Sequence, residues 1–468
     1  MTELWRRDAG ELAGMIRTGE TTSTEVVEAH LARIDQVNGK LNAIVHVMAD
    51  EAREGAAAAD AAIAAGQDLG PLGGVPFTIK ENIDVAGLPT THGLVALKDA
   101  VPAEDAPVVE RMKGAGAVPI GRTNLPDMGL RIHTDNALHG LTRTPWEPNH
   151  TAGGSSGGEG SALASGMSPI GLGNDLGGSL RNPATCNGIA SIKPTTGRIP
   201  GADTFPMPDG SITMQLLAVQ GPMARTIDDV RIGLSVLAGA HVRDPQSVPM
   251  PLEAPAPGAR KVAICAEPPG GATDPRVAEL TRAAGQALEA AGCAVDEVTP
   301  PSYAEVIDCW RTLVVSDITL GLPLLEPIVS ADAAAFLHMA SEIEDPPSFD
   351  AIGNAWMNRQ ALMRAWDHFF TEWDVVVTPT WAQLPFEHGA DAVDIDGALA
   401  ALIDGARPVM PANVLAFPSA AVPVGVVDGL PVGVLVNGPR WSELLCLEVA
   451  EAIESAGMAP TMPIDPTY

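Results

Sequence analysis

The sequence contains few basic residues: 28 Lys and Arg stand against 58 Asp and Glu in 468 residues, for a formal net charge of −30. A surface with this excess of acid repels phosphate backbones, so nucleic-acid binding is not expected. No segment combines low apolar content with high charge, the composition typical of disordered chains. With 46% hydrophobic and 18% charged residues, the chain is expected to fold as a globular protein.

Long uninterrupted apolar runs are also absent. Charges are scattered through residues 1–20, which lack the apolar stretch of a signal peptide. The uncharged stretch 408–427 contains four prolines, and proline breaks a helix that would span a membrane. The sequence therefore predicts neither export nor a membrane span.

The five cysteines are widely spaced, with no CxxC pair and no adjacent histidines. This spacing favours reduced core thiols in a cytoplasmic protein over a disulfide framework or a zinc site. Neither a metal nor a cofactor is expected.

Short apolar runs that predict strands alternate with helical patterns along the chain. VPFTIK (75–80) and VPIGRT (118–123) flank the helical stretch 107–117, and later runs occur at 374–380 and 421–439. This alternation indicates an α/β protein. No internal repeat or linker interrupts the chain, so we expect one domain over residues 1–468.

A glycine-rich stretch holds two adjacent serines, Ser155 and Ser156, in the pattern GxSxG. That pattern is the nucleophile elbow of α/β-hydrolases, but an elbow follows a strand, and TPWEPNHTA before it indicates a loop. Histidines at 133, 139 and 150 lie nearby in sequence, so a serine-histidine mechanism is an alternative.

A second glycine-rich stretch, GLGNDLGGS, ends at Ser179. Glycines allow main-chain N–H groups to approach a ligand closely, so this stretch could form an oxyanion hole beside its own nucleophile. A phosphate cradle is disfavoured because GxGxxG requires glycine where Leu176 stands, and no lysine follows as in GxxxxGK[ST]. A non-catalytic glycine-rich binding module is an alternative.

Several stretches together resemble the amidase signature family of serine hydrolases. They are FTIKENIDVAGLPTTHG (77–93), RTNLPDMG (122–129), the long central stretch 144–197 and GLPVGVLVNGPR (429–440). The resemblance covers nearly the whole chain and is weakest between Leu252 and Asp374. It implies a mixed central β-sheet between layers of helices, a signature core at about 70–240, and a variable, mostly helical pocket region at about 300–410.

Carried over by position, the family's catalytic triad falls on Lys80, Ser155 and Ser179. Ser179 would be the nucleophile, Ser155 would relay its proton to Lys80, and Ser156 would support the loop. Such a mechanism is chemically sensible because a serine hydroxyl needs an adjacent base, and lysine becomes one when burial lowers its pKa. Lys80 ends an apolar strand-like run, where burial is expected.

The resemblance also implies the surroundings of the triad. The Gly154–Ser155 peptide bond would be cis, Gly129 would lie against the substrate, and Asp175 would form a structural ion pair with Arg181. The oxyanion hole would be formed by the N–H groups of Leu176, Gly177, Gly178 and Ser179.

Two positions depart from the family pattern. Asn174 stands where many members have threonine, and we expect it to change only hydrogen bonds within the loop. Arg131 occupies a position near the acyl pocket that is usually small. It would either recognise an acidic or carbonyl-rich substrate or, as we favour, lie on the surface. Large side chains of the helical region are expected in the core or the pocket lining: Trp310, Trp356, Met357, Met363 and Trp366.

The sequence thus predicts a hydrolase that cleaves the C–N bond of small carboxylic amides through an acyl-enzyme on Ser179, with water as the second substrate. Cleavage of carbamates (urethanes) or esters by the same triad is the first alternative. A less favoured one is the glutamyl-tRNA amidotransferase component that supplies ammonia for charged tRNA, which would need a partner chain. Family members occur as dimers, so a homodimer is open, and the sequence does not specify the substrate.

Overall fold

The computed structural model describes residues 3–202, 210–342, 348–393, 398–460, 462–466 and 468. Eleven strands form one sheet in the order β1-β3-β2-β4-β6-β5-β10-β11-β9-β7-β8. The strands are β1 (Ile44–Val47), β2 (Pro76–Lys80), β3 (Val118–Thr123), β4 (Ile170–Asp175), β5 (Ala190–Lys193), β6 (Val219–Ala224), β7 (Lys261–Ile264), β8 (Ala294–Glu297), β9 (Val375–Pro379), β10 (Ser419–Val427) and β11 (Leu430–Asn437).

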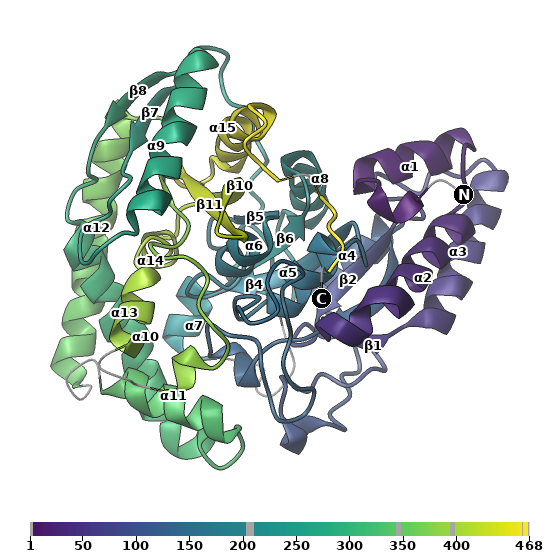
Figure 1. Ribbon diagram of the computed structural model, residues 1–468, viewed down its shortest axis with the longest axis horizontal. Coiled ribbons are helices and arrows are strands. Elements are labelled where there is room, and N and C mark those ends of the chain that lie inside the picture. The colour runs from purple at the N-terminus through teal and green to yellow at the C-terminus, as the bar shows by residue number, and fades with distance from the viewer. Residues whose placement is uncertain (1–2, 203–209, 343–347, 394–397, 461, 467) are drawn as a thin grey trace.

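Helices surround this sheet, which runs from β1, beside α2 and α3, to β8, beside α9 (Figure 1). The helices are α1 (Ala9–Thr18), α2 (Ser23–Leu41), α3 (Ala49–Ala64), α4 (Pro107–Gly114), α5 (Gly157–Ala164), α6 (Arg181–Asn187), α7 (Ile212–Leu217), α8 (Ile227–Leu237), α9 (Pro275–Ala290), α10 (Tyr303–Leu325), α11 (Ala331–Ser341), α12 (Phe349–Glu372), α13 (Ala398–Gly405), α14 (Met410–Val414) and α15 (Glu443–Ser455). Helices α10 to α14, with β9 between α12 and α13, occupy the stretch around residues 300–410.

The sheet is mixed and has a core on each face. β2 pairs in parallel with β3 and β4, whereas β10 pairs antiparallel with β5 and β11. Because side chains alternate across a strand, Val375 and Val377 of β9 join the core under α8, α9 and α15. Val376 joins the core under α6, α10 and α12. The predicted α/β fold, with its sheet between helical layers, is confirmed.

The parallel strands β2 and β4 position the site. The two strands lie side by side with Ile79 opposite Leu172, so the loops that follow them leave the sheet at the same edge. Lys80 is the last residue of β2, and Asp175 is the last residue of β4. The two loops that carry the predicted chemistry therefore start next to each other.

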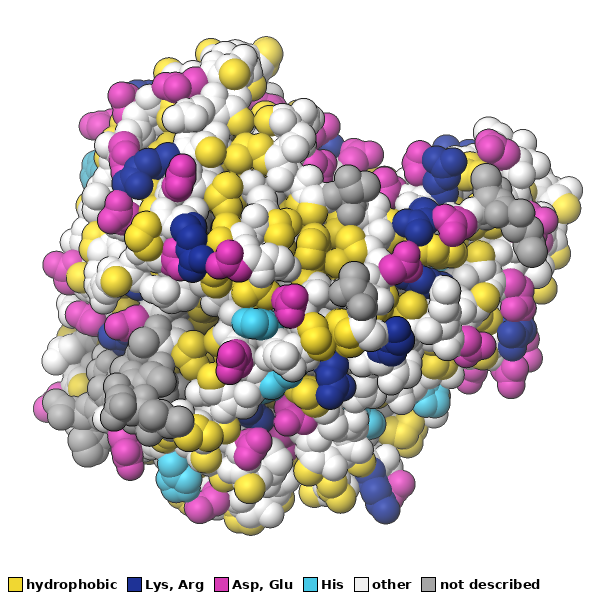
Figure 2. Space-filling model, in the orientation of Figure 1, with side chains coloured by type: hydrophobic (Ala, Val, Ile, Leu, Met, Phe, Trp, Pro, Cys, Tyr) yellow, Lys and Arg dark blue, Asp and Glu magenta, His cyan; other side chains and the backbone are white. Residues whose placement is uncertain are grey.

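The surface agrees with the acidic composition. Figure 2 shows Asp and Glu side chains over much of the visible face, with Lys and Arg interspersed among them. All five cysteines are free thiols. Among the residues that the structure describes, no helix has the length and apolar character needed to span a bilayer. The cytoplasmic location and the single domain stay predictions.

Candidate active site

Lys80 and Ser155 meet in the interior of the protein. The Lys80 side chain is fully buried, and its Nζ lies 2.7 Å from Ser155 Oγ. Burial lowers the pKa of Lys80 to about 7, although the negative charges of Asp175 and Glu159 act in the opposite direction. A large fraction of Lys80 is therefore a neutral amine near pH 7, and a neutral amine can accept a proton.

The backbone at Ser155 is tightly enclosed. The Gly154–Ser155 peptide bond is cis, as the family resemblance implied. A Cβ on Gly154 would lie 2.5 Å from the carbonyl carbon of Ile132, and a Cβ on Gly129 would lie 3.2 Å from Ser155 Oγ. Glycine is therefore required where the segment after Gly129 passes the Ser155 loop.

Ser179 lies at the end of the loop that follows β4, where it is partly exposed. Asp175 holds this loop: its carboxylate accepts from the N–H groups of Gly178 (2.9 Å) and Leu180 (3.1 Å). Arg181 pairs with the same carboxylate at 2.9 Å and 3.0 Å, and both side chains are fully buried. The predicted Asp175–Arg181 ion pair is confirmed.

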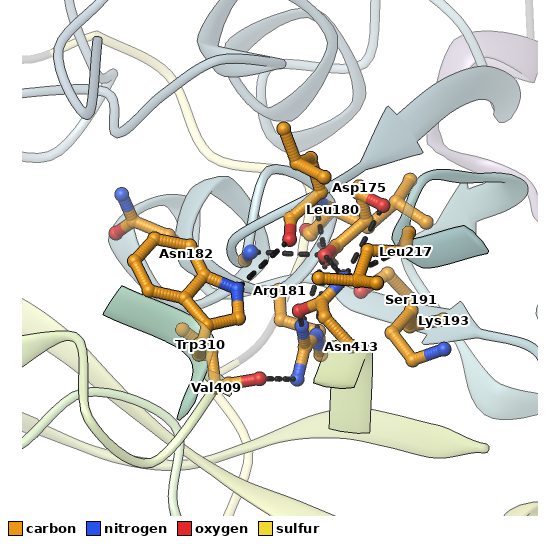
Figure 3. Close-up of polar contacts among 12 residues, drawn as sticks. Asp175, Leu180, Arg181, Asn182, Ser191, Lys193, Leu217, Trp310, Val409 and Asn413 are labelled. Atoms are coloured by element: carbon orange, nitrogen blue, oxygen red, sulfur yellow. Dashed lines mark hydrogen bonds and ion pairs between the residues drawn. The ribbon is translucent and has the colours of Figure 1, made fainter. Parts of the chain in front are cut away.

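The charge on this buried carboxylate is maintained by its partners. Burial alone would raise the pKa of Asp175, but the Arg181 guanidinium and the amide of Asn413 hold it well below its usual range. Figure 3 shows this cluster with Trp310 on one side and Lys193 on the other. The loop that carries Ser179 is thus held by the buried Asp175–Arg181 ion pair.

One predicted oxyanion donor is wrong. The N–H of Gly178 already donates to Asp175, so it is not directed at a reacting carbonyl. The N–H groups of Leu176, Gly177 and Ser179 remain candidates, and all three residues are partly exposed.

The expectation that Asn174 affects only loop hydrogen bonds is also wrong. Its Oδ1 lies 2.6 Å from Lys80 Nζ, so it contacts the candidate base directly. Its Nδ2 donates to Asn82 Oδ1 at 3.0 Å. The departure from threonine at this position was visible in the sequence, but the contact across two strands was not.

Arg131 does not lie on the surface, contrary to our favoured interpretation. It is 2% exposed, and its Nε and Nη2 pair with the two carboxylate oxygens of Asp391 at 2.9 Å and 2.8 Å. Asp391 belongs to a short 3-10 helix (Ala390–Ala392), 260 residues further along the chain. The positive charge is neutralised inside the protein, which also argues against recognition of an acidic substrate.

The remaining predicted residues lie close to the serine loop. Ser156 is fully buried before α5, and its Oγ has no hydrogen-bond partner among the described residues, so it contributes by packing. The His133 ring contacts Thr151 Oγ1 at 2.8 Å. The side chain beside Ser155 Oγ is thus Lys80 and not a histidine, which does not favour the serine-histidine alternative.

Two buried ionisable groups were missed by the sequence analysis. Burial raises the pKa of Glu159 to about 7, while hydrogen bonds from Thr78 and Thr123 and the charge of Lys80 lower it. Burial lowers the pKa of Lys193, at the end of β5, to about 7. No local pattern marks either residue, because their burial arises from distant elements.

Apolar side chains lie beside the loop before Ser179 and after Gly129. Trp310 of α10 donates from Nε1 to the Leu176 carbonyl at 3.3 Å, and its ring lies where a Cβ on Gly177 would come within 2.6 Å. Partly buried Leu130 and Ile132 pack with apolar residues of α10 and α11. The expectation of burial is wrong for Met357, which is 67% exposed.

The fold and the relatives together identify the class of this protein, a mixed α/β hydrolase that acts on amides. A model of the Amidase family matches residues 25–447, and the chain belongs to that family. An indoleacetamide hydrolase from Bradyrhizobium diazoefficiens is 41% identical over 463 residues, which cover 97% of this chain and 87% of the relative.

Two further proteins are similar over almost their full lengths. A glutamyl-tRNA(Gln) amidotransferase subunit from Salinispora arenicola is 31% identical, with 97% of this chain and 98% of the relative covered. The crystal structure of a bacterial aryl acylamidase of the amidase signature family matches with a TM-score of 0.84. It is 28% identical and covers 96% of both chains.

Proposed function

We propose that this protein hydrolyses small, uncharged aromatic amides through an acyl-enzyme on Ser179, with Lys80 as the base and Ser155 as the proton relay. The observation that carries the proposal is the 2.7 Å contact between Ser155 Oγ and the fully buried Lys80 Nζ. A serine is a weak nucleophile until a base takes its proton, and a desolvated lysine is such a base.

In the proposed mechanism the proton travels from Ser179 through Ser155 to Lys80 and returns by the same path. Ser179 Oγ attacks the amide carbon and passes its proton to Ser155 Oγ, while Ser155 passes its own proton to Lys80 Nζ. The N–H groups of Leu176, Gly177 and Ser179 stabilise the negative oxygen of the tetrahedral intermediate. As the C–N bond breaks, the proton returns through Ser155 to the leaving nitrogen, and water then cleaves the acyl ester by the same path.

The side chains beside the loop support an uncharged, apolar substrate. Leu130, Ile132 and Trp310 are partly buried apolar groups in this region. The charge of Arg131 is balanced by Asp391, and the charges of Asp135 and Asp332 also act on Arg131, so this arginine offers no free positive charge to a negative substrate. The 41% identity to an indoleacetamide hydrolase supports arylacetamides as the substrate class.

A role within a glutamyl-tRNA(Gln) amidotransferase is a second candidate, because one of its subunits in Salinispora arenicola matches 97% of this chain. The net charge of −30 argues against a tRNA neighbour. Hydrolysis by the purified chain alone, without partner proteins, supports the simple hydrolase. Turnover that appears only with added partner proteins supports the second candidate.

The test is a turnover screen of the purified chain with indole-3-acetamide, phenylacetamide, aryl carbamates and aryl esters, in parallel with fluorophosphonate labelling. We expect ammonia release from the arylacetamides and one labelled serine, Ser179. Ser179→Ala should abolish labelling and reduce kcat/KM by about 10³-fold or more. Labelling that survives in Ser179→Ala contradicts the assignment of the nucleophile. Faster turnover of carbamates than amides would change the substrate class.

A further inference from the structure

Asn174 lies between Lys80 and a second asparagine, Asn82, and its side-chain amide contacts both. Its Nδ2 donates to Asn82 Oδ1 at 3.0 Å, so the amide oxygen faces the other way, towards Lys80 Nζ at 2.6 Å. An isolated amide could present either end to the lysine. In the structure Asn82 presents its oxygen to Asn174 Nδ2, and this arrangement leaves the Asn174 carbonyl towards Lys80.

This orientation constrains the hydrogens on Lys80. A carbonyl oxygen only accepts hydrogen bonds, so one N–H of Lys80 must point at Asn174. A neutral amine has two N–H groups and one lone pair in a tetrahedral arrangement. With one N–H directed at Asn174 Oδ1, rotation about the Lys80 side chain is restricted and the lone pair can face Ser155 Oγ at 2.7 Å.

We propose that Asn174, oriented by Asn82, is a positioning residue that aims the Lys80 lone pair at Ser155. The inference rests on the proposed function, in which Lys80 is the base. Asn174 is the residue before the last of β4, and it is partly exposed although it contacts the buried lysine.

The charges around Lys80 explain why the orienting group is neutral. Asp175 of β4 and Glu159 of α5 both raise the pKa of Lys80, and the charge of Asp175 is shared with Arg181. Glu159 is held by the hydroxyls of Thr78 and Thr123. A third carboxylate, in contact with Nζ, would stabilise the ammonium form and leave no lone pair for Ser155. An amide supplies the same acceptor without that charge.

The test compares isosteric variants of the full-length protein by the rate at which fluorophosphonate labels Ser179 as a function of pH. Asn174→Asp should move the acid limb of this profile upward by about one pH unit or more, because it favours the ammonium form. Asn174→Leu should lower the alkaline plateau about tenfold or more, because the lone pair is no longer oriented. Asn174→Thr, which keeps an oxygen acceptor, should stay within about threefold of the wild type.

A second pair of variants tests the orientation from one residue further away. Asn82→Leu frees the Asn174 amide to turn its Nδ2 towards Lys80, so the plateau should fall. Asn82→Asp keeps the acceptor and should label faster than Asn82→Leu. Asn354→Asp makes the same chemical change at a position on α12 remote in sequence from the serine loops, and it should leave the acid limb in place. Thermal melting of each variant separates loss of folding from loss of orientation.

The inference would be overturned if the pH profile of the labelling rate kept its wild-type acid limb in Asn174→Asp and its wild-type alkaline plateau in Asn174→Leu and Asn82→Leu. Lys80→Met distinguishes this failure from failure of the proposed function. If Lys80→Met abolishes labelling while the Asn174 variants behave as wild type, only the positioning role is wrong. If Lys80→Met is labelled like the wild type, the proposed base itself is wrong.

Discussion

Two buried lysines, Lys80 and Lys193, occupy matching positions in this protein. Each is the last residue of a strand of the central sheet, and each is fully buried. Burial lowers both pKa values to about 7, and the charge of Asp175 acts on both. Their neighbours differ: Lys80 Nζ meets a serine hydroxyl, whereas Lys193 Nζ donates to the carbonyl of Pro194 at 2.6 Å.

The comparison shows that burial and a lowered pKa do not make a lysine a base. A lysine that acts as a base needs a hydroxyl within hydrogen-bond distance, and Ser155 Oγ lies 2.7 Å from Lys80 Nζ. A backbone carbonyl can only accept, so it gives no proton to Lys193. We therefore assign Lys193 a structural role beside the Asp175–Arg181 pair and expect the two lysines to respond differently to the same substitution.

The largest effect should come from methionine at each lysine, which removes the amine but keeps most of the side-chain volume. We expect Lys80→Met to reduce kcat/KM for an arylacetamide by about 10³-fold or more, because the base is lost. Lys193→Met should stay within about threefold of the wild type. Steady-state kinetics at about pH 8 measure both. A similar loss of kcat/KM in Lys80→Met and Lys193→Met would contradict the assignment of different roles to the two lysines.

The next effect tests the carboxylate that acts on both lysines. Asp175→Asn leaves Arg181 buried without its partner, so the free energy of unfolding should fall by about 3–5 kcal/mol. Chemical denaturation measures this change. Asn174→Thr, at the preceding residue, is a matched control that leaves the ion pair intact. Equal stability of Asp175→Asn and the wild type would show that the pair does not hold the nucleophile loop.

A smaller effect concerns the pH dependence of the free energy of unfolding, which should reveal the buried Lys193. The folded-state pKa of Lys193, about 7, lies below its unfolded value, so the unfolded chain binds more protons between about pH 7 and pH 10. Burial of this lysine therefore destabilises the fold most below about pH 7, and this penalty is relieved progressively as pH rises to about 10. In Lys193→Met the resulting rise in stability should be smaller by about 2 kcal/mol or more.

Denaturation of Lys193→Met and the wild type at both ends of this window measures the difference. Lys98→Met, at a lysine outside the core, provides the control. Identical pH dependence of Lys193→Met and the wild type would place Lys193 in contact with water.

The smallest effect concerns Glu159, whose charge acts on Lys80 alone of the two lysines. Glu159→Gln removes a negative charge that favours the ammonium form, so the acid limb of kcat/KM should move to lower pH. We expect a shift of less than about one pH unit, since Glu159 is itself protonated to a large extent near pH 7. A limb that moves upward would contradict this electrostatic assignment.

Much of the fold was predictable because patterns of neighbouring residues determine where many helices and strands begin and end. The capping box of Thr22 and Glu25 begins α2, Thr226 caps α8, and the short apolar runs became β2, β3, β9, β10 and β11. The cis peptide bond and the Asp175–Arg181 pair also followed from a family motif that is continuous in sequence.

The failures have a common cause. Arg131 looked like a surface residue because its partner, Asp391, lies 260 residues away. Asn174 looked peripheral because Lys80 reaches it only through the pairing of β2 with β4. Gly178 looked like an oxyanion donor because nothing local shows that Asp175 turns back to accept its N–H.

The sequence by itself therefore determined the α/β class, the strands β2, β3, β9, β10 and β11, the mostly helical stretch near residues 300–410, and which residue types could perform acyl chemistry. These features depend on hydrophobic periodicity and on motifs of a few adjacent residues. Only the tertiary structure decided which of two equally buried lysines faces a serine and where each charge is neutralised. Such contacts depend on strand order and on packing between distant segments, and those are set by burial of the whole chain.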